Sequence, residues 1–185
     1  MPTAIRFTTR YEMTEDRIKV SLELPEDEVQ VLWLTRRLLN RMIPHLLNYL
    51  GQTNSGTASV DTTPTVGRGA APLHAEAVQR FNQEAAVSAI ERQPGVGAGG
   101  QKPANNIAYV VTSVDVRTGP QTLVLDFKGG EEVLHSLPFG EDALRQWLSI
   151  VYSQYKAGDW REGFWPAWIK PADAPVSREE VSLLN

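Results

Sequence analysis

The N-terminal part of the chain contains three short segments with the polarity pattern of β-strands. Residues 4–12 and 18–24 alternate between apolar and polar side chains, and residues 31–34 are apolar at consecutive positions within the segment 28–34. Alternation with a period of two predicts half-buried strands, and a strand that is apolar on both faces is typical of the middle of a sheet. We therefore expect a three-stranded meander whose third strand is central.

The pattern then changes to the 3.6-residue period of a helix over residues 36–50. Thr35 is a suitable N-cap residue, and Gly51 is a suitable C′ residue. The apolar stripe of this helix consists of Leu38, Leu39, Met42, Ile43, Leu46, Leu47 and Leu50.

A similar order of elements recurs near the C-terminus. Segments 107–116, 121–127 and 131–137 have the composition of strands, and residues 141–157 show a helical stripe that ends at Gly158. The predicted fold is α+β, with two three-stranded β-meanders each followed by an α-helix. An internal duplication is one interpretation, and chance recurrence of a common motif is the other.

An insertion, residues 52–106, separates the two half-units 1–51 and 107–158. Its segments 52–72 and 93–106 contain few large apolar residues, so we expect flexible loops there. Between them, residues 73–92 favour a helix with a thin apolar stripe of Leu73, Ala77, Phe81 and Ala85. Such a helix is either a lid on its own domain or a segment that docks on a partner.

The segment 159–169 contains four large aromatic residues: Trp160, Phe164, Trp165 and Trp168. Prolines within it prevent a long helix. These aromatic side chains either close the core beneath the last helix or form an exposed surface for a partner. We predict one domain over residues 1–169 and a loose polar tail over residues 170–185.

Composition excludes several classes of function. The 185 residues are 42% hydrophobic, which suits one globular domain, and the net charge of −4 disfavours non-specific nucleic-acid binding. The absence of cysteine excludes disulfides, thiolate catalysis and zinc–cysteine or iron–sulfur sites. Neither an N-terminal apolar signal core nor an apolar run of about 18 residues occurs, so we expect a soluble, cytoplasmic protein.

Motifs of catalysis and cofactor binding are mostly absent: the sequence lacks G-x-S-x-G, H-E-x-x-H, Walker A and G-x-G-x-x-G. The leading hypothesis is therefore a non-enzymatic adaptor or assembly subunit without a cofactor or a metal. The alternative is a small enzyme or a ligand- or metal-binding protein with a site near His135, Asp115 and Asp126. The candidate partner-binding residues are Arg37, Arg41, Phe81, Trp160, Phe164, Trp165 and Trp168.

Two arginines, Arg36 and Arg37, stand where the first long helix should begin. A cation at a helix N-terminus is unfavourable by about 0.3–1 kcal/mol. Arg37 and Arg41 share one stripe of the helix with His45, opposite the leucines. This stripe is either a solvated face, whose arginines pair with acids such as Glu26, Asp27 or Glu28, or a basic patch for an acidic partner. Exposed edge strands also make a homodimer possible.

Overall fold

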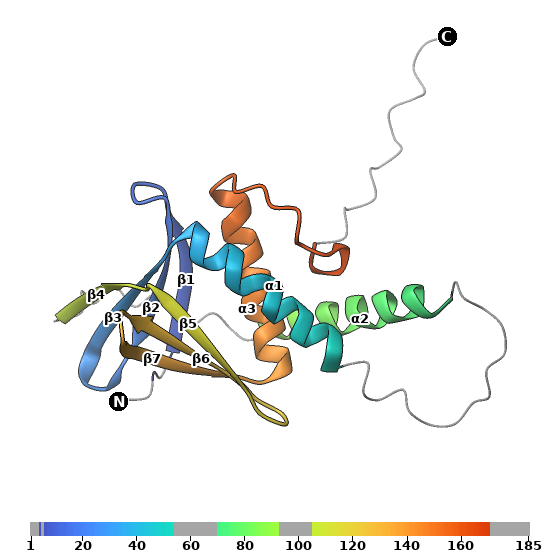
Figure 1. Ribbon diagram of the computed structural model, residues 1–185, viewed down its shortest axis with the longest axis horizontal. Coiled ribbons are helices and arrows are strands. Elements are labelled where there is room, and N and C mark those ends of the chain that lie inside the picture. The colour runs from blue at the N-terminus through green and yellow to red at the C-terminus, as the bar shows by residue number, and fades with distance from the viewer. Residues whose placement is uncertain (1–3, 5, 54–69, 93–104, 171–185) are drawn as a thin grey trace, which may run out of the picture.

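The computed structural model describes residues 4, 6–53, 70–92 and 105–170, and its architecture is α+β (Figure 1). Within these residues, seven strands form two sheets, and three α-helices and two short 3-10 helices accompany them. The predicted α+β class is thereby confirmed, but the arrangement as two three-stranded meanders is not, because one sheet has four strands. The predicted loose tail, except Lys170, and most of the two predicted loops of the insertion lie outside the described residues. The prediction of a loop is wrong for residues 52–53 and 70–72, which belong to helices.

The first sheet has four strands in the order β1 (Arg6–Glu12), β2 (Arg17–Glu23), β3 (Glu28–Leu34) and β4 (Asn105–Val110). A 3-10 turn, η1 (Pro25–Asp27), connects β2 to β3. The first three strands are antiparallel neighbours, whereas β4 lies parallel to β3. Strand β3 therefore has a neighbour on each side, as its apolar faces predict, but the fourth strand was not expected in this sheet.

The second sheet consists of β5 (Ser113–Thr118), β6 (Leu123–Gly129) and β7 (Glu132–Phe139), all antiparallel. The prediction of one strand over residues 107–116 is wrong, because β4 and β5 belong to different sheets. The Val111 amide donates to the Trp33 carbonyl, whereas the next amide, that of Thr112, donates to the Lys128 carbonyl. The chain changes sheet between these two residues, and the two halves of the molecule therefore contribute unequally to the sheets.

Helix α1 (Arg36–Thr53) begins as its sequence predicts but ends later. The Thr35 hydroxyl oxygen accepts a hydrogen bond from the Leu38 amide at 3.2 Å, which confirms the N-cap. The helix continues through Gly51, so the prediction of this glycine as the C′ residue is wrong. Glycine weakens a helix by about 1 kcal/mol relative to alanine, but it does not end one by itself. Helix α3 (Glu141–Ala157) ends at its Gly158 cap as predicted.

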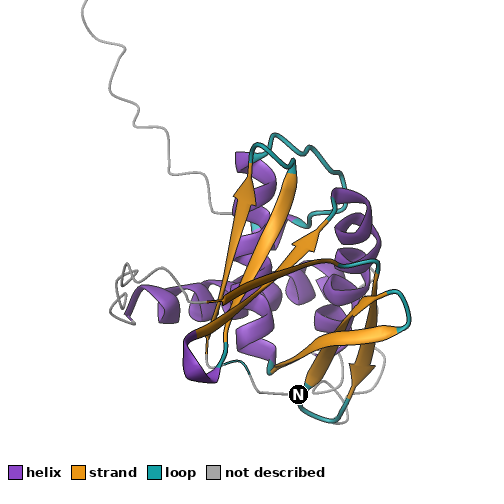
Figure 2. Ribbon diagram, turned by 90° about the vertical axis from the view of Figure 1, so that its left-hand side faces the viewer, coloured by secondary structure: helices purple, strands orange, loops and turns teal. Residues whose placement is uncertain are grey.

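The core lies between the strands and the pair of helices α1 and α3 (Figures 1 and 2). Both predicted helical stripes face it: Leu39, Ile43, Leu46 and Leu50 of α1 are fully buried, and so are Leu144, Leu148 and Val151 of α3. Both sheets and both helices contribute to one hydrophobic cluster. The predicted domain boundaries remain a prediction.

Helix α2 (Ala70–Arg92) extends away from the sheets and packs against α3 and the 3-10 helix η2 (Ala167–Ile169) (Figure 1). The helix thus packs on its own domain, as the lid alternative expects, but the described part of its apolar stripe faces outward. Phe81 is 71% exposed, and Ala77 and Ala85 of the predicted stripe are exposed as well. The buried positions are instead Gln79, Gln83 and Ala86. The side chain of Leu73 lies outside the described ones.

The reason for this orientation is Arg145 of α3, whose side chain is fully buried. Its guanidinium donates to the Gln79 side-chain oxygen at 2.7 Å and to Glu141 at 2.9 Å, and it lies 5.5 Å from the ring centre of Trp168. In addition, the Gln83 amide donates to the Arg145 carbonyl. A buried charge requires polar partners, so α2 turns its glutamines inward and leaves Phe81 outside.

Replacement of Leu46 by alanine tests this packing. We expect Leu46→Ala to lower the free energy of unfolding by about 2–5 kcal/mol, because it leaves a cavity between α1 and the sheets. The control variant Arg41→Ala, on the exposed face of the same helix, should change it by less than about 0.5 kcal/mol. Urea unfolding followed by circular dichroism measures both, and equal losses would contradict the packing.

Candidate functional site

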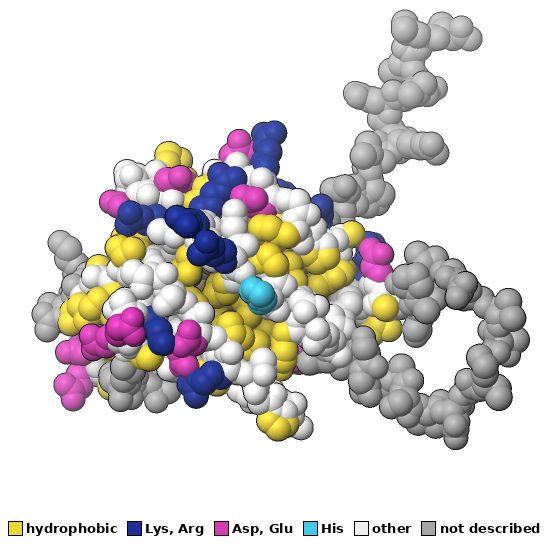
Figure 3. Space-filling model, viewed as in Figure 1, with side chains coloured by type: hydrophobic (Ala, Val, Ile, Leu, Met, Phe, Trp, Pro, Cys, Tyr) yellow, Lys and Arg dark blue, Asp and Glu magenta, His cyan; other side chains and the backbone are white. Residues whose placement is uncertain are grey.

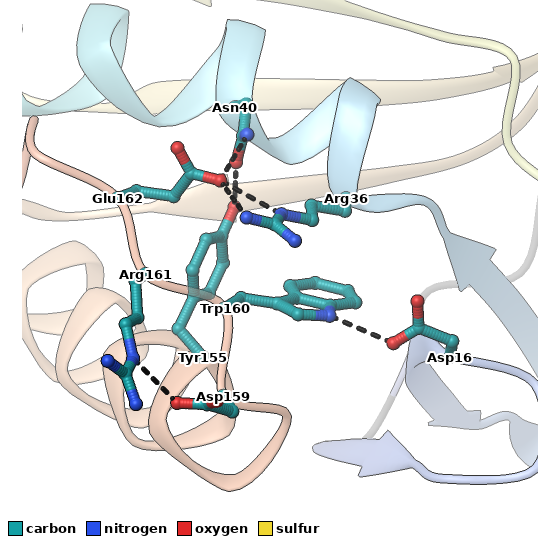
Figure 4. Close-up of polar contacts among 8 residues, drawn as sticks. All are labelled: Asp16, Arg36, Asn40, Tyr155, Asp159, Trp160, Arg161 and Glu162. Atoms are coloured by element: carbon teal, nitrogen blue, oxygen red, sulfur yellow. Dashed lines mark hydrogen bonds and ion pairs between the residues drawn. The ribbon is translucent and has the colours of Figure 1, made fainter.

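Helix α1 and the segment after α3 are joined by a cluster of polar contacts around Glu162, which Figure 4 shows. One carboxylate oxygen of Glu162 accepts hydrogen bonds from Arg36, through Nε at 2.9 Å and Nη2 at 2.7 Å, and from Asn40 at 2.8 Å. The Tyr155 hydroxyl donates to the side-chain oxygen of Asn40 at 2.8 Å. The Arg36 guanidinium also lies over the Trp160 ring, at 5.8 Å from its centre. We call Arg36, Asn40, Tyr155, Trp160 and Glu162 the α1–tail cluster.

The electrostatics of this cluster favour the ionised carboxylate. Hydrogen bonds from Arg36 and Asn40 hold the pKa of Glu162 below its usual range, whereas burial raises the pKa of the Tyr155 phenol. At the rim, Asp16 accepts hydrogen bonds from Tyr11 and Trp160, which lower its pKa. These contacts join α1 to the segment after α3, so we interpret the cluster as a structural clamp.

The four aromatic residues of the tail divide into two pairs. Trp160 and Trp165 belong to the buried core, and Tyr155 lies edge-on to both rings, at 5.1 and 5.2 Å. Phe164 and Trp168 are only partly buried. Closure of the core therefore accounts for Trp160 and Trp165, whereas a partner surface retains at most Phe164 and Trp168. A partner-binding role for any of the four remains a prediction.

A hollow of about 450 Å³ lies beside the tail. Its walls include Tyr152, Lys156, Arg161 and Lys170. The Arg161 guanidinium pairs with Asp159 at 2.9 Å, on the surface. Among the described residues, no group of three histidine or acidic side chains has a spacing that would hold a metal ion. The hollow therefore offers ammonium groups, carboxylates and aromatic walls.

The arginine stripe of α1 is solvated along most of its length. Figure 3 shows several basic side chains on the face viewed in Figure 1. Arg37 and Arg41 of α1 are exposed and form no ion pair with any described residue. Glu26, Asp27 and Glu28, which were expected to pair with these arginines, form no ion pair with them in the described structure. Arg36 does form an ion pair, but with Glu162, which lies 126 residues away in the sequence. Whether Arg37 and Arg41 bind a partner remains a prediction.

The alternative site at His135, Asp115 and Asp126 does not assemble. In the second sheet, Asp126 lies opposite both Asp115 and Ser136, whereas His135 lies opposite Phe127 and therefore on the other face. Arg117 pairs with Asp126 and holds its pKa below the usual range, and Lys128 pairs with Asp115. His135 is buried, which lowers its pKa. The two carboxylates thus serve ion pairs, away from the histidine.

A surface that the sequence analysis missed lies on β4. Three large apolar side chains of this strand are exposed: Ile107 by 53%, Tyr109 by 37% and Val110 by 46%. Strand β4 forms one edge of the first sheet, so its outer side has no neighbouring strand among the described residues. An apolar strand with an unpaired edge is a ready template for another strand.

The other sheet edges in the described structure are protected. At the outer side of β1, the Tyr11 amide donates to the Gln154 side chain at 2.8 Å, and Thr9 accepts from Trp147. Strand β5 carries charged residues, Asp115 and Arg117, and β7 contains Pro138. Strand β4, of sequence NNIAYV, has neither a charge nor a proline. A signal was present in the sequence, because the one charged residue of segment 107–116, Asp115, lies in its second half.

Comparisons of the chain with protein-family models, with curated proteins and with solved structures found no match. None of the helices in the described part of the chain combines the length and the apolar character needed to cross a membrane.

Replacement of the two adjacent arginines separates their roles. We expect Arg36→Ala to lower the free energy of unfolding by about 1–2 kcal/mol, because it removes the ion pair with Glu162 and the contact with Trp160. Arg37→Ala, one residue away in the same helix turn, should change it by less than about 0.5 kcal/mol. Chemical denaturation of both variants is the measurement, and a larger loss for Arg37→Ala would contradict the pairing.

The shifted pKa of Glu162 predicts an acid dependence. Because the folded-state pKa is lowered, the unfolded chain takes up the proton first, so the stabilisation is complete above the usual range of glutamate and is lost as the pH falls through the folded pKa. Between about pH 6 and pH 3, the urea midpoint of the wild type should therefore fall more than that of Glu162→Gln. Glu132→Gln, at an exposed position of β7, should retain the full decrease, and an equal decrease in all three proteins would refute the role of Glu162.

Proposed function

We propose that this protein is a non-enzymatic interaction subunit that binds a protein partner by adding a strand to β4. The observation that carries the proposal is the contrast among the sheet edges: β4 alone, among the edges in the described residues, combines exposed apolar side chains with the absence of charge, proline and a covering side chain. Natural sheets protect edges that are not meant to pair.

The backbone of β4 is suitable for strand addition. The Val111 amide points toward β3, where it donates to the Trp33 carbonyl at 3.0 Å. Peptide groups alternate in direction along a strand, so the N–H and C=O groups of Ala108 and Val110 point to the outer edge. A partner strand would find these groups in position for ladder hydrogen bonds, as in other complexes that form by strand addition.

The side chains of β4 extend an apolar face that the helices leave uncovered. Tyr109 lies beside Leu32 of β3, and the two side chains share one face of the sheet because they are register partners. Leu32 is fully buried under the helices, whereas Tyr109 is 37% exposed. A partner strand with apolar residues would continue this face and bury Ile107 and Tyr109.

The outer face of α2 provides a second contact in this proposal. Phe81 is an exposed aromatic residue on a helix whose polar side faces the protein, and partly buried Trp168 lies at the adjoining end of the tail. The insertion helix and the tail therefore remain a second proposed binding surface, apart from β4, which is the principal one (Figure 1). We also propose a cytoplasmic location, since a chain without cysteine suits a reducing compartment. The duplication of the two halves is likewise a proposal, and it is supported by their common order of strands and helix.

Affinity purification from cells that express the protein tests this function. Tagged wild type should retain its partner, including any untagged copy of itself, and Tyr109→Lys should lose it because the lysine places a charge on the pairing face. Val116→Lys is the matched control, since Val116 is 38% exposed on β5, and this variant should retain the partner. A partner that Tyr109→Lys still binds, or that only Phe81→Lys releases, would contradict strand addition at β4.

A further inference from the structure

The identity of the partner strand follows from the chemistry of β4, and this inference rests on the proposed function. We infer that the strand is β4 of a second copy of this chain, paired antiparallel about a two-fold axis at Ala108. The two four-stranded sheets then form one continuous sheet across the dimer. The two-fold relation makes the interface isologous, the commonest arrangement in protein dimers.

The backbone allows this pairing in a defined register. The peptide groups of Asn106, Ala108 and Val110 point outward from β4, as deduced from the Val111 hydrogen bond. In antiparallel pairing, residues that exchange both hydrogen bonds lie directly opposite each other. With Ala108 opposite Ala108 of the second copy, Asn106 faces Val110 of the second copy, so every outward peptide group within the strand has a partner.

The same register places complementary side chains together. Ile107 lies opposite Tyr109 of the second copy, and the two-fold axis produces this pair twice. Both residues lie on the sheet face that also carries the buried Leu32 of β3. They form non-hydrogen-bonded pairs, in which side chains are closest, and a β-branched residue opposite an aromatic one is a favourable cross-strand pair.

The absence of charged side chains in β4 permits pairing with an identical strand. Like charges directly opposite each other destabilise a ladder, and β4 has none to bring together. Shifting the register by two residues toward either terminus would leave Ile107 or Tyr109 opposite its own counterpart and would shorten the overlap within the strand. The register at Ala108 is therefore the one that uses both exposed side chains and the whole strand.

Cysteine substitution gives a direct test, because the natural chain contains no cysteine. We expect Ala108→Cys to form a disulfide-linked dimer on mild oxidation, since Cα atoms in a hydrogen-bonded antiparallel pair are about 5.5 Å apart, within disulfide range. Val110→Cys is the matched control. Its two copies would lie about 13 Å apart along the strands, so it should not cross-link. Cross-linking that is equal in both variants, or faster in Val110→Cys, would overturn the register.

Analytical ultracentrifugation of the purified protein tests the dimer without a covalent link. The wild type should be dimeric, and Ala108→Pro should raise the dissociation constant at least tenfold, because proline removes one outward N–H and leaves the hydrogen bonds to β3 in place. If Ala108→Pro does not fold, Tyr109→Lys serves in its place. A wild type that stays monomeric overturns this inference. If the affinity purification then still recovers a different protein through Tyr109, the proposed function stands without a homodimer; if it recovers none, both fall.

Discussion

The hydrogen-bonded chain from Tyr155 through Asn40 to Glu162 and Arg36 holds the rest of the structure in place. It joins the first long helix to the segment after the last one, and it thereby fixes α1 and α3 against each other over both sheets. Trp160 and Trp165 fill the space beneath it. The basic residue at the start of α1 is explained by this contact: a modest helix-dipole penalty is offset by an ion pair and an aromatic contact.

A second constraint, the burial of Arg145, determines which surface α2 shows to solvent. A fully buried guanidinium with a single carboxylate partner needs further acceptors, and Gln79 supplies one of them. The arrangement is incomplete, because Arg145 Nη1 and Gln83 Oε1 have no hydrogen-bond partner among the described residues. Each buried polar atom left in this way costs about 1–3 kcal/mol. The exposure of Phe81 is thus a consequence of polar contacts on the opposite side of its helix.

The two constraints together leave β4 uncovered. Helices α1 and α3 are held over the central strands, and α2 packs on α3 and η2, at a distance from the sheet edge. The edges of β1, β5 and β7 are closed by a side-chain hydrogen bond, charges and a proline, respectively. In the proposed function, the principal interaction surface is therefore a strand edge, where backbone groups would provide affinity and Ile107 and Tyr109 would provide selectivity.

The sequence by itself determined the elements with strong periodicity. Strands β1 to β3, helices α1 and α3 and their buried stripes follow from apolar spacing, because burial of one face stabilises each of them. Thr35 likewise marked the start of α1 through a local hydrogen bond. These features depend on residues a few positions apart, so a pattern within the sequence is sufficient to find them.

Only the tertiary structure decided the features that depend on distant residues. Segment 107–116 divides into β4 and β5 because the Val111 amide donates to β3, whereas the Thr112 amide donates to β6. The alternation of polarity along a strand is the same in either sheet, so the sequence pattern does not reveal this division. The position of Arg36 is explained by its ion pair with Glu162, which is distant in the sequence. The polar face of α2 is its buried face because it supplies hydrogen bonds to Arg145 of α3. The candidate interface on β4 is likewise a property of the whole sheet, since a strand becomes an unprotected edge only through the position of its neighbours.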